Sequence, residues 1–251
     1  VSVAGVILNR IGSPRHREMI ERALQDIGMP VLGAVPRSQV LTLPERHLGL
    51  VQAGEHGDLA AFLGDAAEHV AAHVDLDALR EVARPVSPAD TAADTAAKLP
   101  PLGQRIAVAR DVAFAFTYPH MLDGWREQGA ELSFFSPLAD EAPEEAADAV
   151  FLPGGYPELH AHKLAATSNF KAGMKLAAER GTLIYGECGG YMTLGQRLIN
   201  AEGVSHDMLG FLPLVTSFQT RKLHLGYRRL TPLAKLPFGA DLMAHEFHYA
   251  S

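Results

Sequence analysis

The chain has 251 residues, of which 47% are apolar and 20% charged, a balance typical of a soluble globular protein. Its net charge of −7 argues against a general nucleic-acid binder, and its single cysteine excludes an internal disulfide framework or a thiolate zinc cluster. The sequence shows no apolar run of about 18 residues that predicts a membrane span and no signal-peptide pattern. We therefore expect a cytoplasmic protein with room for two domains.

The first part of the chain alternates apolar runs with amphipathic stretches. We expect a strand, a helix, a strand and a helix at residues 3–9, 15–28, 30–36 and 57–81. Ser13 can cap the first helix, and Pro14 suits its first turn. This alternation favours a parallel, doubly wound α/β domain over residues 1–82.

A change of composition separates this part from the rest. Residues 83–104 are rich in Pro, Ala, Thr and Asp and lack apolar periodicity, which is typical of a linker. Beyond them we expect helices at 118–128 and 163–179, and strands at 105–110, 131–137, 149–155, 182–187, 214–218, 222–230 and 244–250. Residues 105–251 are therefore predicted to form a second α/β domain.

The only cysteine, Cys188, lies in the glycine cluster GECGG, directly after the predicted strand TLIYGE. Gly-x-Cys-x-Gly after a strand has the form of a nucleophile elbow, in which the chain turns sharply into a helix and projects the thiol. The helix N-terminus is expected to favour the thiolate, and the N–H of Gly189 to face a developing oxyanion. A small buried cysteine is the alternative, but it leaves the flanking glycines unexplained.

A thiolate nucleophile needs a base and a second oxyanion donor. Of the twelve histidines, those in AHEFHYAS are the strongest candidates, and Glu246 shares a strand face with His248. The loop FLPGGYPEL follows another predicted strand, and its pair Gly154 and Gly155 lets backbone N–H groups approach a ligand. A structural histidine and a plain turn are the alternatives. Together these features suggest acyl transfer through a thioester.

These motifs resemble the class I, triad-type glutamine amidotransferase domain. LPGGYPEL, YGECGGYM and HEFHY are most similar to the cobyrinic acid a,c-diamide synthase family, which includes the hydrogenobyrinic acid enzymes. GVILNRIGSPRHREMIERAL and VLGAVPRSQVLTLPERHLGLV resemble the second half of that family's dethiobiotin-synthetase-like ATP-binding domain. The implied fold is α/β with two doubly wound domains, a partial P-loop-type ATP-binding domain followed by a class I glutamine amidotransferase-like domain.

The resemblance implies a glutamine-hydrolysing carbon–nitrogen ligase of cobalamin biosynthesis. Glutamine would form a γ-glutamyl thioester on Cys188 with His248 as general acid and base, while Gly154, Gly155 and Gly189 hold the oxyanion. ATP and Mg²⁺ would activate the a and c acetate carboxylates of cobyrinic or hydrogenobyrinic acid for amidation by ammonia. The implied partners are L-glutamine and a corrinoid or other tetrapyrrole polycarboxylate, with neither nucleic acid nor membrane, and a homodimer is left open.

Two features depart from the wider pattern. Many triad glutaminases carry an acid two residues after the histidine, where this chain has Ala250, so a Cys–His dyad is the better expectation. Glu246, two residues before the histidine, is expected to orient His248 poorly. The sequence also has no Gly-x-x-x-x-Gly-Lys-Ser/Thr phosphate loop and starts abruptly in an apolar run. We therefore expect that an upstream portion is missing and that this chain alone does not complete the ligase step.

The first domain offers one candidate for nucleotide binding, and no metal ligands are predicted in the chain. Asn9, at the end of the first predicted strand, resembles an asparagine with which related domains contact adenine, and an asparagine that caps the turn is the equal alternative. Three other interpretations of the whole chain stay open. They are cobyric acid synthase or another tetrapyrrole amidotransferase, a cysteine hydrolase or peptidase with the same elbow, and a binding module without catalysis.

Overall fold

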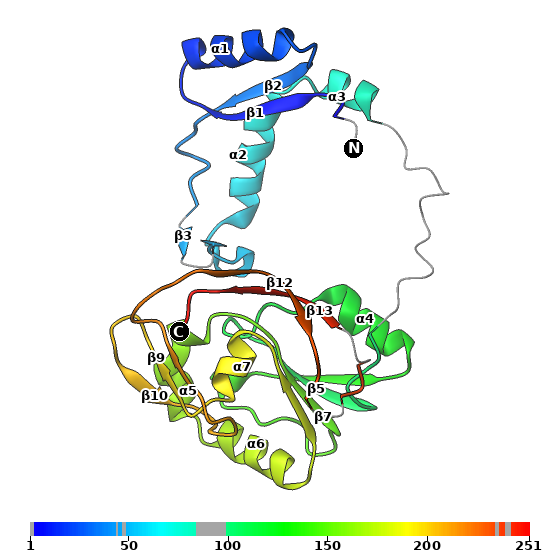
Figure 1. The fold of residues 1–251 in the computed structure, drawn as a ribbon, viewed down its shortest axis with the longest axis vertical. Helices are drawn as coiled ribbons and strands as arrows, with labels where there is room; N and C mark the ends of the chain where they lie inside the picture. Colours follow the sequence, from blue (N-terminus) through cyan, green and yellow to red (C-terminus); the bar gives the residue numbers. More distant parts are fainter. Residues whose placement is uncertain (1–2, 44, 47–48, 84–98, 234–235, 239–241) are drawn as a thin grey trace. The chain divides into compact units, whose positions relative to one another are not determined.

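The structure is a computed structural model, and it describes residues 3–43, 45–46, 49–83, 99–233, 236–238 and 242–251. The chain divides into two compact units, Val1–Thr95 and Ala96–Ser251, each with its own strands and helices (Figure 1). Most of the predicted linker 83–104 lies outside the described residues. Within the described part of the chain, no helix combines the length and the apolar character needed to cross a lipid bilayer.

The first unit contains a two-stranded parallel sheet joined by a crossover helix. Strand β1 (Val6–Ile11) pairs with β2 (Val31–Pro36), and α1 (Pro14–Gln25) connects them (Figure 1). The hydroxyl of Ser13 accepts a hydrogen bond from the N–H of His16 at 3.2 Å, which confirms the predicted start of the helix. The remaining elements are β3 (Glu45–Arg46), β4 (Gly49–Leu50), a 3₁₀ turn at Ala53–Glu55, α2 (Leu59–Ala71) and α3 (Leu76–Val82).

The predicted helix at 57–81 is wrong in one respect, because it is interrupted between α2 and α3. Here the chain pairs with β2 instead. The N–H of Ala34 donates to the carbonyl of His73 at 2.9 Å, and the N–H of Asp75 donates to the carbonyl of Leu32 at 2.8 Å. The carboxylate of Asp75 then caps α3. Backbone groups that a continuous helix would need are used by the sheet, so the helix ends and restarts.

The second unit is built on a four-stranded parallel sheet in the order β6-β5-β7-β8. Its strands are β5 (Arg105–Ala109), β6 (Glu131–Phe135), β7 (Ala149–Leu152) and β8 (Leu183–Gly186). Its helices are α4 (Pro119–Glu127), α5 (Ala161–Ala166), α6 (Asn169–Glu179) and α7 (Gly189–Thr193), with 3₁₀ turns at Pro137–Ala139 and Pro157–His160. This is the parallel α/β arrangement that the sequence predicts.

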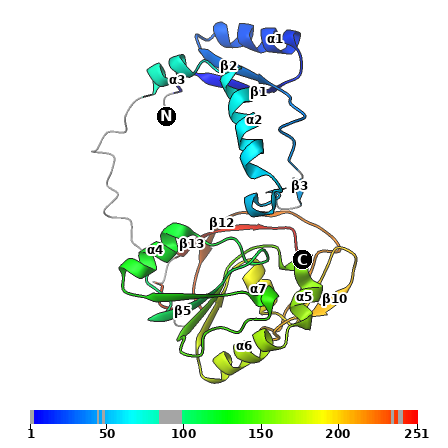
Figure 2. The ribbon, with the colours of Figure 1, turned by 180° about the vertical axis from the view of Figure 1, so that it is seen from behind.

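Neighbouring residues of the central strands point into two cores on opposite faces of this sheet. Val150 of β7 lies in one core with Met174 of α6, and Phe151 of β7 lies in the other with Trp125 of α4. In both views of the ribbon the strands run between α4 and α6 (Figures 1 and 2). Because the strands are buried on both faces, their carboxyl ends form the edge at which a site can open to solvent.

The predicted helix at 163–179 is also two helices. Asp140 causes the break from a distance: its Oδ1 accepts from the N–H of Phe170 at 2.9 Å, and its Oδ2 accepts from the hydroxyl of Ser168 at 3.2 Å. Thr167 lies between the two helices with extended backbone angles. Capping by the Asp140 side chain lets α6 begin afresh at Asn169 instead of continuing α5.

The chain after α7 is rich in strands, as predicted. Strands β9 (Arg197–Ile199), β10 (Ser205–Asp207) and β11 (Val215–Ser217) form a sheet in the order β10-β9-β11. Strands β12 (His224–Leu230) and β13 (Leu242–His248) form an antiparallel ribbon. Beyond β13, Ser251 exchanges two backbone hydrogen bonds with Ser217, at 2.8 and 3.0 Å, and the side chain of Ala250 is buried. The C-terminal residues are thus fixed against β11.

Candidate active site

Cys188 lies at the carboxyl end of β8, at the sharp turn into α7. Its backbone angles are φ 47° and ψ −112°, a region that non-glycine residues rarely adopt and that costs about 1–3 kcal/mol. Two backbone hydrogen bonds hold the turn: the N–H of Glu187 donates to the carbonyl of Leu152 at 3.0 Å, and the N–H of Gly190 donates to the carbonyl of Glu187 at 2.8 Å. The turn predicted at GECGG is therefore present, and it presents the thiol at the edge of the sheet.

Two glycines allow the backbone to pack closely around this turn. A Cβ added at Gly190 would lie 1.9 Å from the carbonyl oxygen of Leu152, so α7 rests directly on β7. A Cβ added at Gly155 would lie 2.0 Å from the carbonyl oxygen of Ala113, in the loop after β5. Any side chain at either position would push these segments apart. The loops that follow β5, β7 and β8 thus meet at Cys188 because glycine stands at their contacts.

Two backbone donors converge on the sulfur. The backbone N–H groups of Gly155 and Gly189 both face the thiol of Cys188 and act to lower its pKa. Gly154 lies against the same side chain, since a Cβ at that position would be 3.2 Å from the Cβ of Cys188. The structure therefore brings together four of the residues that the sequence singles out. One N–H from the loop after β7 and one from the start of α7 form the kind of donor pair that stabilises an oxyanion.

The pKa of Cys188 is raised above that of an ordinary thiol. Burial of the sulfur is the largest cause, the N–H groups of Gly189 and Gly155 offset part of it, and the charges of Glu158 and Glu187 add to it. The residue as a whole reaches solvent, so the desolvation comes from groups packed around the sulfur. The sequence led us to expect a favoured thiolate. In the structure desolvation of the sulfur outweighs the two donors, so the thiol form is favoured instead.

The loop after β5 contributes residues that the sequence analysis missed. The N–H of Phe116 donates to the carbonyl of Gly154 at 2.9 Å, and its ring meets that of Tyr156 edge-on at 5.2 Å. Burial raises the pKa of Tyr118, and the nearby charges of Glu187 and Cys188 raise it further. The available signal was the aromatic run FAFTYP at 114–119, three residues after the predicted strand 105–110, since a loop that follows a strand opens at the same edge of a parallel sheet.

His248, the predicted base, is the last residue of β13. Its Nδ1 lies 3.1 Å from the carbonyl oxygen of Ala250, and its Nε2 lies 3.0 Å from Oε1 of Glu246. Oε2 of Glu246 forms an ion pair with Arg228 of β12. Both ring nitrogens thus have partners other than Cys188, and the thiol–imidazole pairing stays a prediction.

The expectation that Glu246 orients His248 poorly is wrong. The two residues are on one face of the strand, and the glutamate side chain is long enough to fold along the strand and reach the ring. The imidazole is thereby held between a carboxylate and a backbone carbonyl. This arrangement fixes the orientation of the ring without an acid two residues after the histidine, where Ala250 stands.

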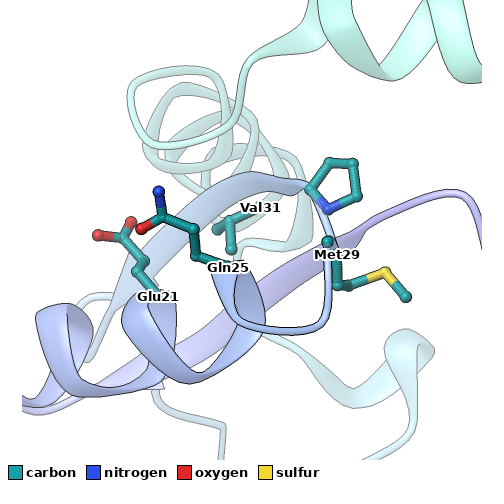
Figure 3. A pocket seen from close by; sticks show the side chains of 6 residues that line it. Glu21, Gln25, Met29 and Val31 are labelled. Atoms are coloured by element: carbon teal, nitrogen blue, oxygen red, sulfur yellow. The ribbon is translucent and has the colours of Figure 1, made fainter.

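Asn9 lies in β1 of the first unit. Its side-chain oxygen accepts a hydrogen bond from the N–H of Arg10 at 2.9 Å, which is a local contact between neighbours within β1. A cavity of about 350 Å³ lies in the same unit, where α1 ends and β2 begins (Figure 3). Its lining residues are Glu21, Gln25, Gly28, Met29, Pro30 and Val31. Asn9 is not among them, so its role toward a nucleotide stays a prediction.

Comparison with known protein families matches residues 105–251 to the CobB/CobQ-like glutamine amidotransferase domain. The chain is 61% identical over 251 residues to the hydrogenobyrinate a,c-diamide synthase of Brucella abortus, a match that covers all of this chain and 57% of that protein. The synthase of the same name from Rhizobium meliloti is 60% identical over 251 residues, with 100% and 58% covered. That from Rhodobacter capsulatus is 56% identical over 252 residues, with 99% and 57% covered. The chain thus spans somewhat more than half the length of these relatives.

Proposed function

The chain belongs to the CobB/CobQ-like glutamine amidotransferase family, and we propose that it hydrolyses L-glutamine at Cys188 to supply ammonia for the a,c-diamidation of hydrogenobyrinic acid. One observation carries the proposal: the N–H groups of Gly155 and Gly189 converge on a strained cysteine at the carboxyl edge of a parallel sheet. A free catalytic thiol suits the reducing cytoplasm, where we place the reaction.

In the first half of the reaction the thiolate of Cys188 attacks the side-chain amide carbon of glutamine. The carbonyl oxygen becomes an oxyanion, which Gly155 and Gly189 stabilise through their N–H groups, with Gly154 beside them. The carbon–nitrogen bond then breaks as the nitrogen takes up a proton. Ammonia leaves, and the γ-glutamyl group stays on the sulfur as a thioester.

His248 moves the protons in this scheme. It accepts the thiol proton, delivers a proton to the leaving nitrogen, and then takes a proton from the water that hydrolyses the thioester to glutamate. Because its ring nitrogens are held by Glu246 and the carbonyl of Ala250, one of these contacts opens when His248 acts. Glu246 is a positioning residue here, since it contacts the base and not the substrate.

ATP and Mg²⁺ are the groups that an amide ligase of this family implies, and the residues of this chain do not fit them. The sequence contains no Gly-x-x-x-x-Gly-Lys-Ser/Thr loop to hold the phosphates. In the described structure, the side-chain oxygen of Asn9 accepts a hydrogen bond from the N–H of its neighbour Arg10. We therefore derive no step through ATP. The product that this chain delivers is ammonia, which the complete synthase would transfer to the activated carboxylates.

Ammonia release from L-glutamine by the purified chain tests the proposal. We expect Cys188→Ser to abolish release and His248→Asn to lower the rate by about 10²–10⁴, the usual contribution of a general base. His245→Asn is the matched control, because His245 is on the same strand but on its exposed face and should keep the wild-type rate. Release that persists in Cys188→Ser would contradict the proposal.

A labelling experiment separates a glutaminase from a peptidase with the same elbow. 6-Diazo-5-oxo-L-norleucine, a glutamine-like electrophile, should add once per chain and only at Cys188, as seen by mass spectrometry of the intact protein and its peptides. This readout does not depend on turnover, so it applies even if ammonia release by this chain is slow. Labelling by a peptide electrophile in place of the glutamine analogue would favour the peptidase.

A further inference from the structure

A cluster of metal-ligating side chains lies on the ribbon of β12 and β13. His224 is the direct partner of His248 in the antiparallel pairing, and their rings stack at 4.7 Å between centroids and 14° between planes. Glu246 shares the strand face with His248. All three residues are partly buried, and they come from two strands whose register is fixed by seven paired residues on each. The backbone thus holds them together before any ligand binds.

The distances suit a single small cation. One ligand atom from each of the three residues lies within 4.8 Å of the others, and Nε2 of His248 is 3.0 Å from Oε1 of Glu246. Ligands about 2.0–2.2 Å from a tetrahedral ion are about 3.3–3.6 Å apart. The His248–Glu246 pair therefore already has nearly the required spacing. Rotation of the His224 ring out of the stack closes the remaining gap of about 1 Å.

The donor set selects the type of cation. Two imidazoles and one carboxylate suit Zn²⁺ and other late transition metals, whereas Mg²⁺ and Ca²⁺ prefer oxygen ligands alone. Three protein ligands leave a fourth position for water. Arg228 binds the other carboxylate oxygen of Glu246 and leaves Oε1 facing the histidines, so it orients the ligand although its charge opposes a cation.

We propose that His224, Glu246 and His248 bind one Zn²⁺-type cation, and that the bound cation withdraws His248 from proton transfer. The second half rests on the proposed function, because it takes His248 as the base of glutamine hydrolysis. The first half stands on the geometry of the ribbon alone. Occupation of Nε2 by a metal would replace its contact with Glu246 and remove the lone pair that accepts a proton. A cation at this site would thus act as a reversible inhibitor.

Binding is measured with the untagged full chain and Zn²⁺ alone, in competition with a chromophoric chelator. Two other groups that can bind Zn²⁺ are removed first. Cys188→Ser eliminates the thiol, and His69→Asn breaks the pair formed by His69 of α2 and His73, which follows that helix. In this background we expect one bound Zn²⁺, and His224→Asn should weaken it more than about tenfold, since even outer-shell partners are worth that much. The matched control, His245→Asn, is on the opposite face of β13 and should bind as the background does.

A second measurement needs no substitution at the site and so remains valid if a variant fails to fold. In ¹⁵N imidazole NMR spectra of the background protein, Zn²⁺ should shift the resonances of His224 and His248, while that of His245 stays in place. Unchanged binding in folded His224→Asn, or shifts confined to other histidines, would overturn the site.

The inhibitory half is tested with ammonia release from the otherwise wild-type chain. Zn²⁺ should inhibit and EDTA should restore the rate. In His224→Asn the Zn²⁺ concentration for half-inhibition, relative to that variant's own zinc-free rate, should rise more than about tenfold. If Zn²⁺ half-inhibits His224→Asn at the same concentration as the wild-type chain, the inhibition arises at Cys188, and the inhibitory part of the proposal is wrong. A chain that releases no ammonia refutes the proposed function, while the binding and NMR measurements still decide the site.

Discussion

The phenol of Tyr185 donates a hydrogen bond to Oε1 of Glu187 at 3.1 Å, and Glu187 immediately precedes Cys188 along the chain. Burial raises the pKa of Glu187, and the hydrogen bond from Tyr185 lowers it in part. The pKa of Tyr185 is raised as well, first by burial and then by the charge of Glu187. A carboxyl group with little access to water thus lies beside the nucleophile, where its charge is only weakly screened.

This relationship predicts that Glu187→Gln lowers the pKa of Cys188. The substitution removes one of the two carboxylate charges that raise it, the other being Glu158. The pH dependence of alkylation by iodoacetamide reports this pKa, because the thiolate is the reacting form. We expect the wild-type midpoint to lie above that of an ordinary thiol and the variant's midpoint to lie lower. Since the chain has one cysteine, every adduct reports on this site.

Glu179→Gln serves as the control for this prediction. Glu179 ends α6, where it is exposed and paired with Lys175, so its loss should leave the alkylation midpoint unchanged. If both variants had the same alkylation midpoint, the charge of Glu187 would have no effect on the pKa of the thiol.

The same carboxyl group predicts a pH-dependent stability. The pKa of Glu187 is higher in the folded than in the unfolded chain, so the folded state binds the proton more tightly. The free energy of unfolding therefore falls as pH rises from the ordinary glutamate pKa, about 4.3, through the raised value. Glu187→Gln should raise the melting temperature at neutral pH, and this gain should vanish in acid. A gain of the same size at every pH would point to packing instead of charge.

Two glycine substitutions should change stability in opposite directions. Gly190→Ala forces a Cβ to within 1.9 Å of the carbonyl oxygen of Leu152 and should cost about 1–3 kcal/mol or more. Gly124→Ala, within α4, meets nothing within 4 Å and should gain about 0.5–1 kcal/mol from helix propensity. Urea unfolding midpoints measure both. A stabilised Gly190→Ala would show that α7 does not rest on β7.

The secondary structure was predictable where its cause is local. The apolar runs at 105–110 and 149–155 predict buried strands, which form at Arg105–Ala109 and Ala149–Leu152. The break between α5 and α6 was not predictable, because the side chain that caps α6 belongs to Asp140, 28 residues before Ser168 in the sequence. Likewise, the break before α3 follows from pairing with β2. Long-range partners override local periodicity in both places.

The candidate site was predictable to the same extent. Glycine-rich turns at the ends of parallel strands meet at one edge, which accounts for the meeting of Gly154, Gly155 and Cys188. The direction of the thiol pKa was not predictable, because desolvation depends on groups from several loops that pack around the sulfur. The contact between Glu246 and His248 was not predictable either, because strand alternation determines which face a side chain lies on but not its conformation.

Asp111 positions the loop that covers Gly155. Its Oδ1 accepts from the N–H of Ala113 at 2.8 Å, and its Oδ2 accepts from the hydroxyl of Ser136 at 3.0 Å and from the N–H of Leu138 at 2.9 Å. Asp111→Ala leaves these donors without their acceptor and should cost about 1–3 kcal/mol in urea unfolding.

The loop also holds the carbonyl of Ala113 against Gly155, so Asp111→Ala should slow labelling of Cys188 by the glutamine-like electrophile more than it slows alkylation by iodoacetamide. Iodoacetamide needs only the thiolate, whereas the glutamine analogue needs an ordered Gly155 loop. Asp123→Ala, which removes an exposed ion pair with Arg126 on α4, is the control and should change stability by less than about 1 kcal/mol. Equal slowing of both reagents by Asp111→Ala would mean that the loop shields the thiol without shaping the glutamine site.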